Sequence, residues 1–357
     1  MRVTNKNYRL ILLLACLALS FTGCSRDDGA QVSPDGLERV TVQLDWVPEP
    51  QHGGLYQALA KGYFVEEGIE LRILPGGANV AVLESVALGK ADVGQSATTQ
   101  VITAVARGRL EGDGLVEVEV IFSQSPKLDT RHHFGSRLVF DREGHLFITM
   151  GDRGVRPTSQ DLSSHMGTVA RIFPDGRVPE DNPFVGQDGV QPETWSYGHR
   201  NIQGAALNPW TGALWTHEHG PRGGDEINIP KPGLNYGWPI VTHGINYSGD
   251  PIPEAQGTSK EGMEDPDFVW EVSPGVSGMA FYDHERSPAW SNSLFVGALA
   301  QRALIRMSVD GDTIREEERL LTELGQRIRD VRVGPDGAVY VVTDEADGKV
   351  IKVALGG

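Results

Sequence analysis

Residues 136–152 read SRLVFDREGHLFITMGD: an apolar run, a turn around Glu143-Gly144, a second apolar run and an acidic residue. Residues 329–344, RDVRVGPDGAVYVVTD, repeat this order, and looser copies lie at 204–218 and 278–297. The copies begin about 50–75 residues apart. Matched pairs of short strands that recur at such a spacing predict the blades of a β-propeller with inserted loops.

The composition favours the same class of fold. The chain has 357 residues with 44 glycines and 21 prolines, and glycine at about 12% exceeds its usual ~7%. This favours many tight turns between short strands. We therefore predict an all-β propeller over residues 105–357. A β-sandwich is the alternative, but its strands rarely recur as matched units.

Charge and hydrophobicity exclude two classes of protein. The chain is 39% hydrophobic, and 32 basic against 48 acidic residues give a net charge of −16. It is too apolar for a disordered protein. It is also too acidic to hold a phosphate backbone non-specifically, so we expect no nucleic-acid partner. Two cysteines cannot form a disulfide framework.

The first 24 residues predict an export signal. Three basic residues precede an apolar run at 10–19, which is too short to span a bilayer, and FTGC follows at 21–24. The ending resembles a bacterial lipobox, which implies a lipidated Cys24 and a membrane-anchored, periplasmic protein. Ser25 favours the outer membrane by the same resemblance. An ordinary signal peptide is the alternative. Residues 25–37 are polar and turn-rich and predict a linker.

Residues 38–104 have a different pattern. Strand-like runs at 40–44 and 69–74 alternate with helical patterns at 54–62 and 81–88, which predicts a small α/β fragment with parallel strands.

This fragment resembles the beginning of the substrate-binding proteins that serve ABC importers, of the thiamine-precursor and sulfonate type. The matching strings are LDWVP at 44–48, HGGLY at 52–56, KGYF at 61–64 and GKADVG at 89–94. The resemblance covers only about 65 residues of a two-lobed family, and one wall of a cleft cannot bury most of a ligand.

Polar clusters precede or follow the repeated strands, so loops at one end of a propeller would gather them. His133 with Asp152 is the pair expected of a general base and the carboxylate that orients it. Arg200, Arg327 and Arg329 offer forked donors to carboxylates. Arg327 and Arg329 are two residues apart and would face the same side of a strand.

Two further patterns concern metal ions. Gly220-Pro221 offers unshielded backbone carbonyls, which suit a hard cation such as calcium. His217 and His219 would lie on one face of a strand and could suggest zinc, but no third ligand has a typical spacing.

With these residues in view, the chain from about 103 to 353 resembles the soluble aldose (glucose/sorbosone) dehydrogenases that use pyrroloquinoline quinone. Seven motifs occur in order: HFGSRL at 133–138, GDRG at 151–154, GHRN at 198–201, HGP at 219–221, DEIN at 225–228, NYGW at 235–238 and RIRD at 327–330. Those proteins are six-bladed propellers. Since roughly the first blade and part of the second have no counterpart here, we expect an incomplete six-bladed β-propeller preceded by the α/β fragment.

The resemblance assigns catalytic roles to His133, Asp152 and Arg200, and a cofactor contact to Asn201. It implies that His133 removes the proton of the sugar's anomeric hydroxyl while hydride passes to the quinone, and that Asp152 orients His133. Arg200 and Asn201 would contact the reactive quinone edge, where Arg200 stabilises developing negative charge.

It also assigns the binding of cofactor and metal. Arg327 and Arg329 would hold the cofactor's carboxylates, and the carbonyls of Gly220 and Pro221 would help to bind calcium. Ala300 stands where some relatives have a lysine near the quinone, so one contact would be missing.

The sequence thus predicts an exported sugar dehydrogenase with pyrroloquinoline quinone and Ca²⁺ as cofactors, an aldose as substrate and an external electron acceptor. A lipid-anchored periplasmic solute-binding protein of an ABC importer is one alternative. A non-functional fusion of two incomplete domains is another.

Overall fold

The computed structural model describes residues 36–44, 53–76, 93–95, 104–111, 114–128 and 132–354 except 312, 346 and 347, together with 34, 91 and 130. The predicted signal segment with Cys24, most of the linker and the predicted helix at 81–88 lie outside these residues. No helix among the described residues is long and apolar enough to cross a membrane. The chain divides into two compact units, residues 1–119 and 120–357, so the division lies later than the predicted boundary at 104/105.

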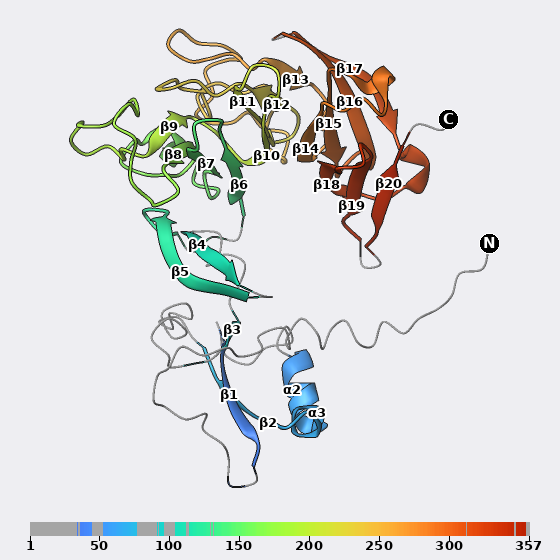
Figure 1. Cartoon of the computed structure of the whole chain (residues 1–357). Helices are drawn as coiled ribbons and strands as arrows, with labels where there is room; N and C mark the ends of the chain where they lie inside the picture. The colour runs from blue at the N-terminus through green and yellow to red at the C-terminus, as the bar shows by residue number, and fades with distance from the viewer. Residues whose placement is uncertain are drawn as a thin grey trace. The chain divides into compact units, whose positions relative to one another are not determined.

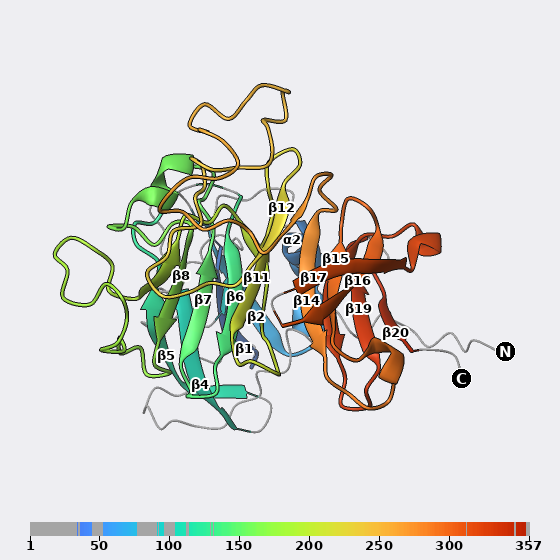
Figure 2. The same ribbon diagram turned by 90° about the horizontal axis from the view of Figure 1, so that it is seen from above.

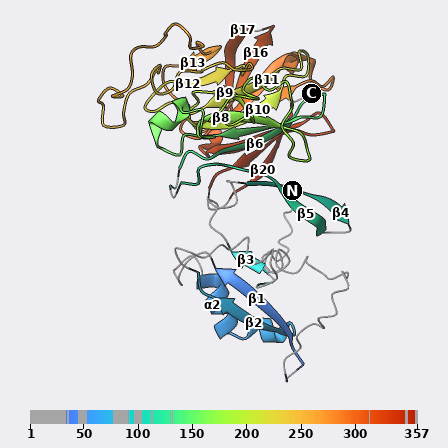
Figure 3. The same cartoon turned by 90° about the vertical axis from the view of Figure 1, so that its left-hand side faces the viewer.

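The first unit contains the predicted parallel α/β arrangement. β1 (Glu38–Leu44) lies between β2 (Ile69–Leu74) and β3 (Val93–Gln95), and both pairings are parallel. The helices α2 (Gly53–Ala60) and α3 (Tyr63–Glu66) connect β1 to β2. Figure 3 shows α2 beside these strands. Val42 and Leu44 of β1 are buried, as expected for apolar residues of a central parallel strand.

A two-stranded sheet follows. It pairs β4 (Ala104–Glu111) with β5 (Gly114–Ser123), and the division between the two units falls within β5.

The second unit consists of antiparallel sheets that follow one another along the chain (Figure 1), and their strand order follows the sequence. The first sheet is β6 (Gly135–Phe140), β7 (Leu146–Met150), β8 (Thr168–Ile172) and β9 (Thr194–Tyr197). The second is β10 (Ile202–Leu207), β11 (Leu214–Glu218), β12 (Asp225–Asn228) and β13 (Phe268–Trp270). The third is β14 (Val276–Tyr282), β15 (Ser293–Ala298), β16 (Ala303–Asp310) and β17 (Thr313–Leu320). The fourth is β18 (Ile328–Val333), β19 (Val339–Thr343) and β20 (Val350–Val353).

Three short 3₁₀ helices lie in the connections between these strands. They span Arg156–Gln160, Pro288–Trp290 and Thr322–Leu324.

These sheets are the blades of a propeller. The first strands of successive sheets, which we call the inner strands, pack against one another in chain order: β6 against β10, β10 against β14 and β14 against β18. Figure 2 shows the sheets following one another in chain order, from green through yellow to red. Each repeat in the sequence begins within or beside one of these inner strands. The predicted propeller is therefore confirmed, and its described part holds four consecutive blades.

Apolar residues fill the spaces between neighbouring blades. Phe147, Val169, Ile202 and Leu214 join the first blade to the second. Tyr282, Trp290 and Phe295 of the third blade pack with Ile328 and Val331 of the fourth. Burying one such side chain stabilises the fold by about 1.5–3 kcal/mol.

One arginine connects all four inner strands. From β6 of the first blade, Arg137 donates through Nε to the carbonyl of Gln203 (2.6 Å) and through Nη2 to the carbonyl of Ser277 (3.4 Å). Its Nη1 lies 3.3 Å from Oδ1 of Asp330 in the fourth blade. Burial lowers the pKa of Arg137, and the charge of Asp330 opposes this effect. Residues far apart in the sequence are thus brought together at the inner strands.

Candidate active site

The predicted base and its orienting carboxylate are in contact. His133 precedes β6 and Asp152 follows β7; these strands are antiparallel, with Gly135 opposite Met150, so the two residues come from adjacent strand ends. Nδ1 of His133 lies 2.6 Å from Oδ1 of Asp152.

The backbone here is unusually tight. His133 adopts a left-handed conformation with φ of 56°, which costs of order 1–3 kcal/mol for a residue other than glycine. A Cβ on Gly151 would lie only 2.2 Å from the carbonyl oxygen of His133, so glycine is required there. Strain of this kind is common where surrounding structure fixes a functional side chain.

Asp152 is a fully buried carboxylate with several donors. Its Oδ1 also accepts from the backbone N–H of Gly154 (2.7 Å), and its Oδ2 accepts from Nε1 of Trp238 (2.7 Å). Burial raises the pKa of Asp152, but the hydrogen bonds from His133, Gly154 and Trp238 outweigh it and hold that pKa below its usual value. Because Asp152 is ionised, its Oδ1 takes a proton-bearing Nδ1 of His133 as donor, and in the neutral form of the ring Nε2 then carries a lone pair that can accept a proton.

Arg200 lies beside this pair. The backbone N–H of Asp152 donates to the Arg200 carbonyl (2.9 Å), and the Arg200 guanidinium lies 5.2 Å from the ring centre of Trp238. Its Nη1 donates to the carbonyls of His219 (2.9 Å) and Gly220 (2.8 Å). Burial lowers the pKa of Arg200, and the charge of Asp152 opposes this. The site therefore contains a base, its carboxylate and a buried cation.

Glu218 fixes the segment that carries Arg200 and Asn201. One oxygen of its buried carboxylate accepts from the backbone N–H groups of both residues, the Asn201 bond being 3.1 Å. The other oxygen accepts from Nδ1 of His199 (2.9 Å) and Nδ2 of Asn228 (3.3 Å). A single carboxylate thus satisfies four donors around this loop.

The predicted calcium-binding carbonyls adjoin Arg200. The Gly220 carbonyl keeps one lone pair after accepting from Arg200, and the Pro221 carbonyl accepts no hydrogen bond within the described part of the chain. Both oxygens of Asp225 are engaged by backbone N–H groups of Gly220, Gly275 and Val276. The two neutral carbonyl oxygens suit calcium, which prefers six to eight oxygen ligands and would take the others from a bound ligand and water.

Arg327 and Arg329 flank the first residue of β18 and share one carboxylate. Their Nη2 atoms lie 2.9 Å and 2.7 Å from Oδ2 of Asp344, as expected for side chains on the same face. Among the described residues, no hydrogen bond or ion pair joins either arginine to His133 or Arg200.

The fourth blade is nevertheless connected to the site. The carbonyl of Ile328, between the two arginines, accepts from Ser277 Oγ (2.6 Å). In the residue before Ser277, the carbonyl of Val276 accepts from Nε2 of His219 (2.5 Å), and His219 in turn contacts Arg200 through its own carbonyl. Nε of Arg327 is shielded from solvent without a partner in the described chain, so its guanidinium retains a donor for an anion.

The structure does not favour the zinc alternative. His217 is fully buried, and its burial, with the charges of Arg137 and His219, lowers its pKa to about 3. Within the described residues, the group of three side chains with metal-ligand geometry is Asp141, Glu143 and His145, which includes neither His217 nor His219.

Two residues of this site were not predicted individually. Trp238 and Glu218 lie in or beside the recognised motifs, but their partners come from other loops. The motifs show that these side chains are present near the site, but the sequence does not identify which residue each of them contacts.

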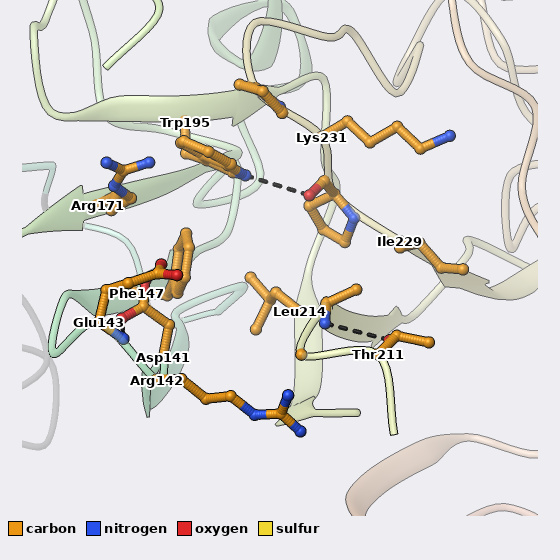
Figure 4. A pocket seen from close by; sticks show the side chains of 14 residues that line it. Asp141, Arg142, Glu143, Phe147, Arg171, Trp195, Thr211, Leu214, Ile229 and Lys231 are labelled. Carbon is orange, nitrogen blue, oxygen red and sulfur yellow. Dashed lines mark hydrogen bonds between the residues drawn. The ribbon is translucent and has the colours of Figure 1, made fainter. Parts of the chain in front are cut away.

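A cavity of about 460 Å³ lies elsewhere, between the turns of the first and second blades (Figure 4). None of the predicted site residues lines it. The ring of Trp195 in its wall is covered by Arg171 at 4.5 Å, and Nε1 of Trp195 donates to the carbonyl of Pro230 (3.1 Å). The oxygens of Asp141 accept from neighbouring donors of its own turn, including Nδ1 of His145. These contacts indicate that Trp195, Arg171 and Asp141 stabilise the turns that carry them.

Comparison with known proteins gives two separate matches. The sequence pattern of the family described as "Glucose / Sorbosone dehydrogenase" matches residues 90–352. The pattern described as "NMT1/THI5 like" matches residues 49–127. The chain is 55% identical over 254 residues to aldose sugar dehydrogenase YliI of Escherichia coli K12, covering 71% of this chain and 68% of that protein.

Solved structures agree with this assignment. A crystal structure of glucose dehydrogenase has a TM-score of 0.70 and 59% identity, covering 71% of this chain and 74% of the other. The PQQ-bound form of aldose sugar dehydrogenase from Streptomyces coelicolor has a TM-score of 0.54 and 27% identity, covering 68% of each chain. With a family pattern matching residues 90–352 and the predicted propeller in place, this chain belongs to the glucose/sorbosone dehydrogenase family.

Proposed function

We propose that the protein oxidises the anomeric hydroxyl of aldose sugars, with pyrroloquinoline quinone as hydride acceptor and calcium as its partner ion. The observation that carries the proposal is the contact of His133 with a buried, ionised Asp152, beside the guanidinium of Arg200. A base and a buried cation are what proton removal with development of negative charge requires.

The chain's own residues divide the work. His133 accepts the hydroxyl proton on Nε2, and Asp152 stabilises the imidazolium that results. The Arg200 guanidinium stabilises negative charge that develops near it, and its burial strengthens this effect because little water screens the charge. The quinone, when bound, supplies the two-electron acceptor, which an external electron acceptor then regenerates.

Binding of the cofactor falls to other residues. Arg327 and Arg329 offer guanidinium donors to its carboxylates, and Nε of Arg327 has no partner within the described chain. Asn201 lies beside Arg200, with its amide oxygen accepting from Gln203 (3.0 Å). Gly220 and Pro221 supply carbonyl oxygens to calcium.

We also propose export, with lipidation at Cys24, anchoring in the outer membrane more than the inner, and a periplasmic location. This rests on the sequence signal of residues 1–24. Metabolic labelling with a radioactive fatty acid tests it. The intact chain should be labelled and Cys24→Ser should not; equal labelling of both would contradict the proposal.

A reconstitution assay tests the proposed activity. Purified protein receives calcium and pyrroloquinoline quinone, and aldose-dependent dye reduction is followed. We expect activity that His133→Gln lowers at least about a thousandfold, since general-base catalysis and base-dependent positioning are lost together. Lys260→Gln serves as the control, because Lys260 is exposed and its replacement should leave dye reduction unchanged.

The competing hypotheses predict different results. A folded, loaded protein without dye reduction, or with equal activity in the parent and His133→Gln, would refute the dehydrogenase proposal. Absence of dye reduction in a protein that limited proteolysis digests rapidly throughout residues 105–357 would instead support a non-functional fusion. The comparisons do not favour the solute-binding alternative, because its family pattern matches only residues 49–127.

A further inference from the structure

Trp238 occupies a fixed position between two functional side chains. It is 5% exposed. Its backbone N–H donates to the carbonyl of Gly198 (2.8 Å), and its own carbonyl accepts from Oγ of Ser159 and Nε2 of Gln160, both at 2.7 Å. These bonds hold the main chain of Trp238 from both sides and so fix the point from which the indole extends.

The edge of the indole meets the carboxylate that orients the base. Nε1 donates to Oδ2 of Asp152 at 2.7 Å, while Oδ1 of Asp152 accepts from Nδ1 of His133. The two oxygens therefore have different donors. Rotation of the carboxylate would break the indole bond, the imidazole bond and the bond from the Gly154 N–H to Oδ1 together, so the indole N–H helps to fix the oxygen that His133 uses.

The face of the same indole ring contacts a second functional side chain, that of Arg200. The Arg200 guanidinium lies 5.2 Å from the ring centre, in the range of a cation–π contact. Arg200 is itself held by the carbonyls of His219 and Gly220. The indole is thus enclosed between a fixed cation and a buried anion.

We propose that Trp238 is a positioning residue of the dehydrogenase site: its indole N–H locks the Asp152 carboxylate, and through it keeps the proton of His133 on Nδ1 and the lone pair on Nε2. The inference rests on the proposed function for its catalytic consequence. The ring state of His133 can be observed without cofactor or sugar.

Trp270 provides a closely matched control. It is also 5% exposed, and its Nε1 also donates at 2.7 Å to a carboxylate, that of Glu316. The change Trp270→Phe therefore removes the same kind of bond from an equally buried indole, in the core between the second and third blades.

The test uses ¹⁵N-histidine NMR on the full, ligand-free chain, with the His133 signals assigned by His133→Gln. The parent and Trp270→Phe should show one His133 tautomer, with the proton on Nδ1. Trp238→Phe should show both tautomers, or exchange of the Nδ1 proton with solvent about tenfold faster, as one lost hydrogen bond to a charged group would give. His133 signals in Trp238→Phe that match those of the parent would overturn the proposal.

Activity adds a second readout. In loaded protein, Trp238→Phe should lower kcat about tenfold with a KM for sugar within about threefold of the parent, the pattern of a lost transition-state interaction. If Trp238→Phe fails to fold, benzothienylalanine at position 238 retains two fused rings without the N–H and replaces it in both measurements. A parent without activity would refute the proposed function and leave the NMR test of Trp238 intact.

Discussion

Glu218→Gln, which replaces one carboxylate oxygen by an amide nitrogen, should destabilise the second unit. The carboxylate of Glu218 accepts four hydrogen bonds, two from the backbone of Arg200 and Asn201 and two from the side chains of His199 and Asn228. A glutamine has one acceptor oxygen, and its NH₂ group would face two of the donors. At least two charge-assisted bonds are therefore lost or weakened.

The size of the effect follows from those bonds. A hydrogen bond to a charged group contributes about 1.5–3 kcal/mol. Removing the negative charge of Glu218 also removes its repulsion of the Glu226 carboxyl group, whose pKa is raised by burial and by that charge. This gain offsets part of the loss. We therefore expect a net loss of about 2–4 kcal/mol in the free energy of unfolding. For a unit of this size that is roughly 4–16 °C in Tm.

Thermal melts followed by circular dichroism measure this loss. Glu317→Gln serves as the control, since Glu317 is exposed and, among the described residues, its carboxylate accepts from Ser308 alone. This change should alter the stability by less than about 0.5 kcal/mol. Equal Tm values for Glu218→Gln and the parent would refute the reasoning that Glu218 holds the loop of Arg200 and Asn201.

Three further predictions follow from the same contacts. Gly151→Ala should cost at least about 3 kcal/mol, measured in urea, because its Cβ would overlap the His133 carbonyl; a loss below 1 kcal/mol would contradict this. Arg137→Met should cost about 2–4 kcal/mol in the same assay, since it leaves the carbonyls of Gln203 and Ser277 without their side-chain donor and leaves Asp330 with Arg332 alone of its two arginine partners. His217 is buried neutral with a pKa of about 3 against 6.5 unfolded, so its contribution is present above pH 6.5 and is lost as the pH falls from 6.5 towards 3. His217→Gln should flatten that part of the stability-against-pH curve, and an unchanged slope would show that His217 is accessible to protons when folded.

The propeller could be predicted from the sequence because its signal is local and repeated. Repeats that begin at residues 136, 204, 278 and 329 correspond to inner strands that begin at Gly135, Ile202, Val276 and Ile328. The turns between apolar runs fix where each strand ends. Strand pairing within a blade is between neighbours in sequence, so no long-range information is required.

The candidate site was predictable only in part. His133 and Asp152 come from adjacent strands of one blade, and their contact follows from that pairing. Trp238 and Glu218 act on residues of other loops, so their partners depend on how loops cross between blades. Burial does not reveal which donor meets which acceptor.

The two arginines of the fourth blade illustrate a further limit. Their common face was predictable from the spacing of two residues along a strand. Their shared partner Asp344 lies at the end of the next strand, and the sequence pattern showed only that it was acidic.

The central claim is that loops from separate blades form one site for the quinone, the sugar and calcium. A crystal structure of the protein grown with calcium and pyrroloquinoline quinone tests it directly. We predict the quinone beside Arg200, with its carboxylates on Arg327 and Arg329 and calcium on the carbonyls of Gly220 and Pro221. Density for the quinone away from Arg200 and His133, or none at saturating concentration, would contradict the account.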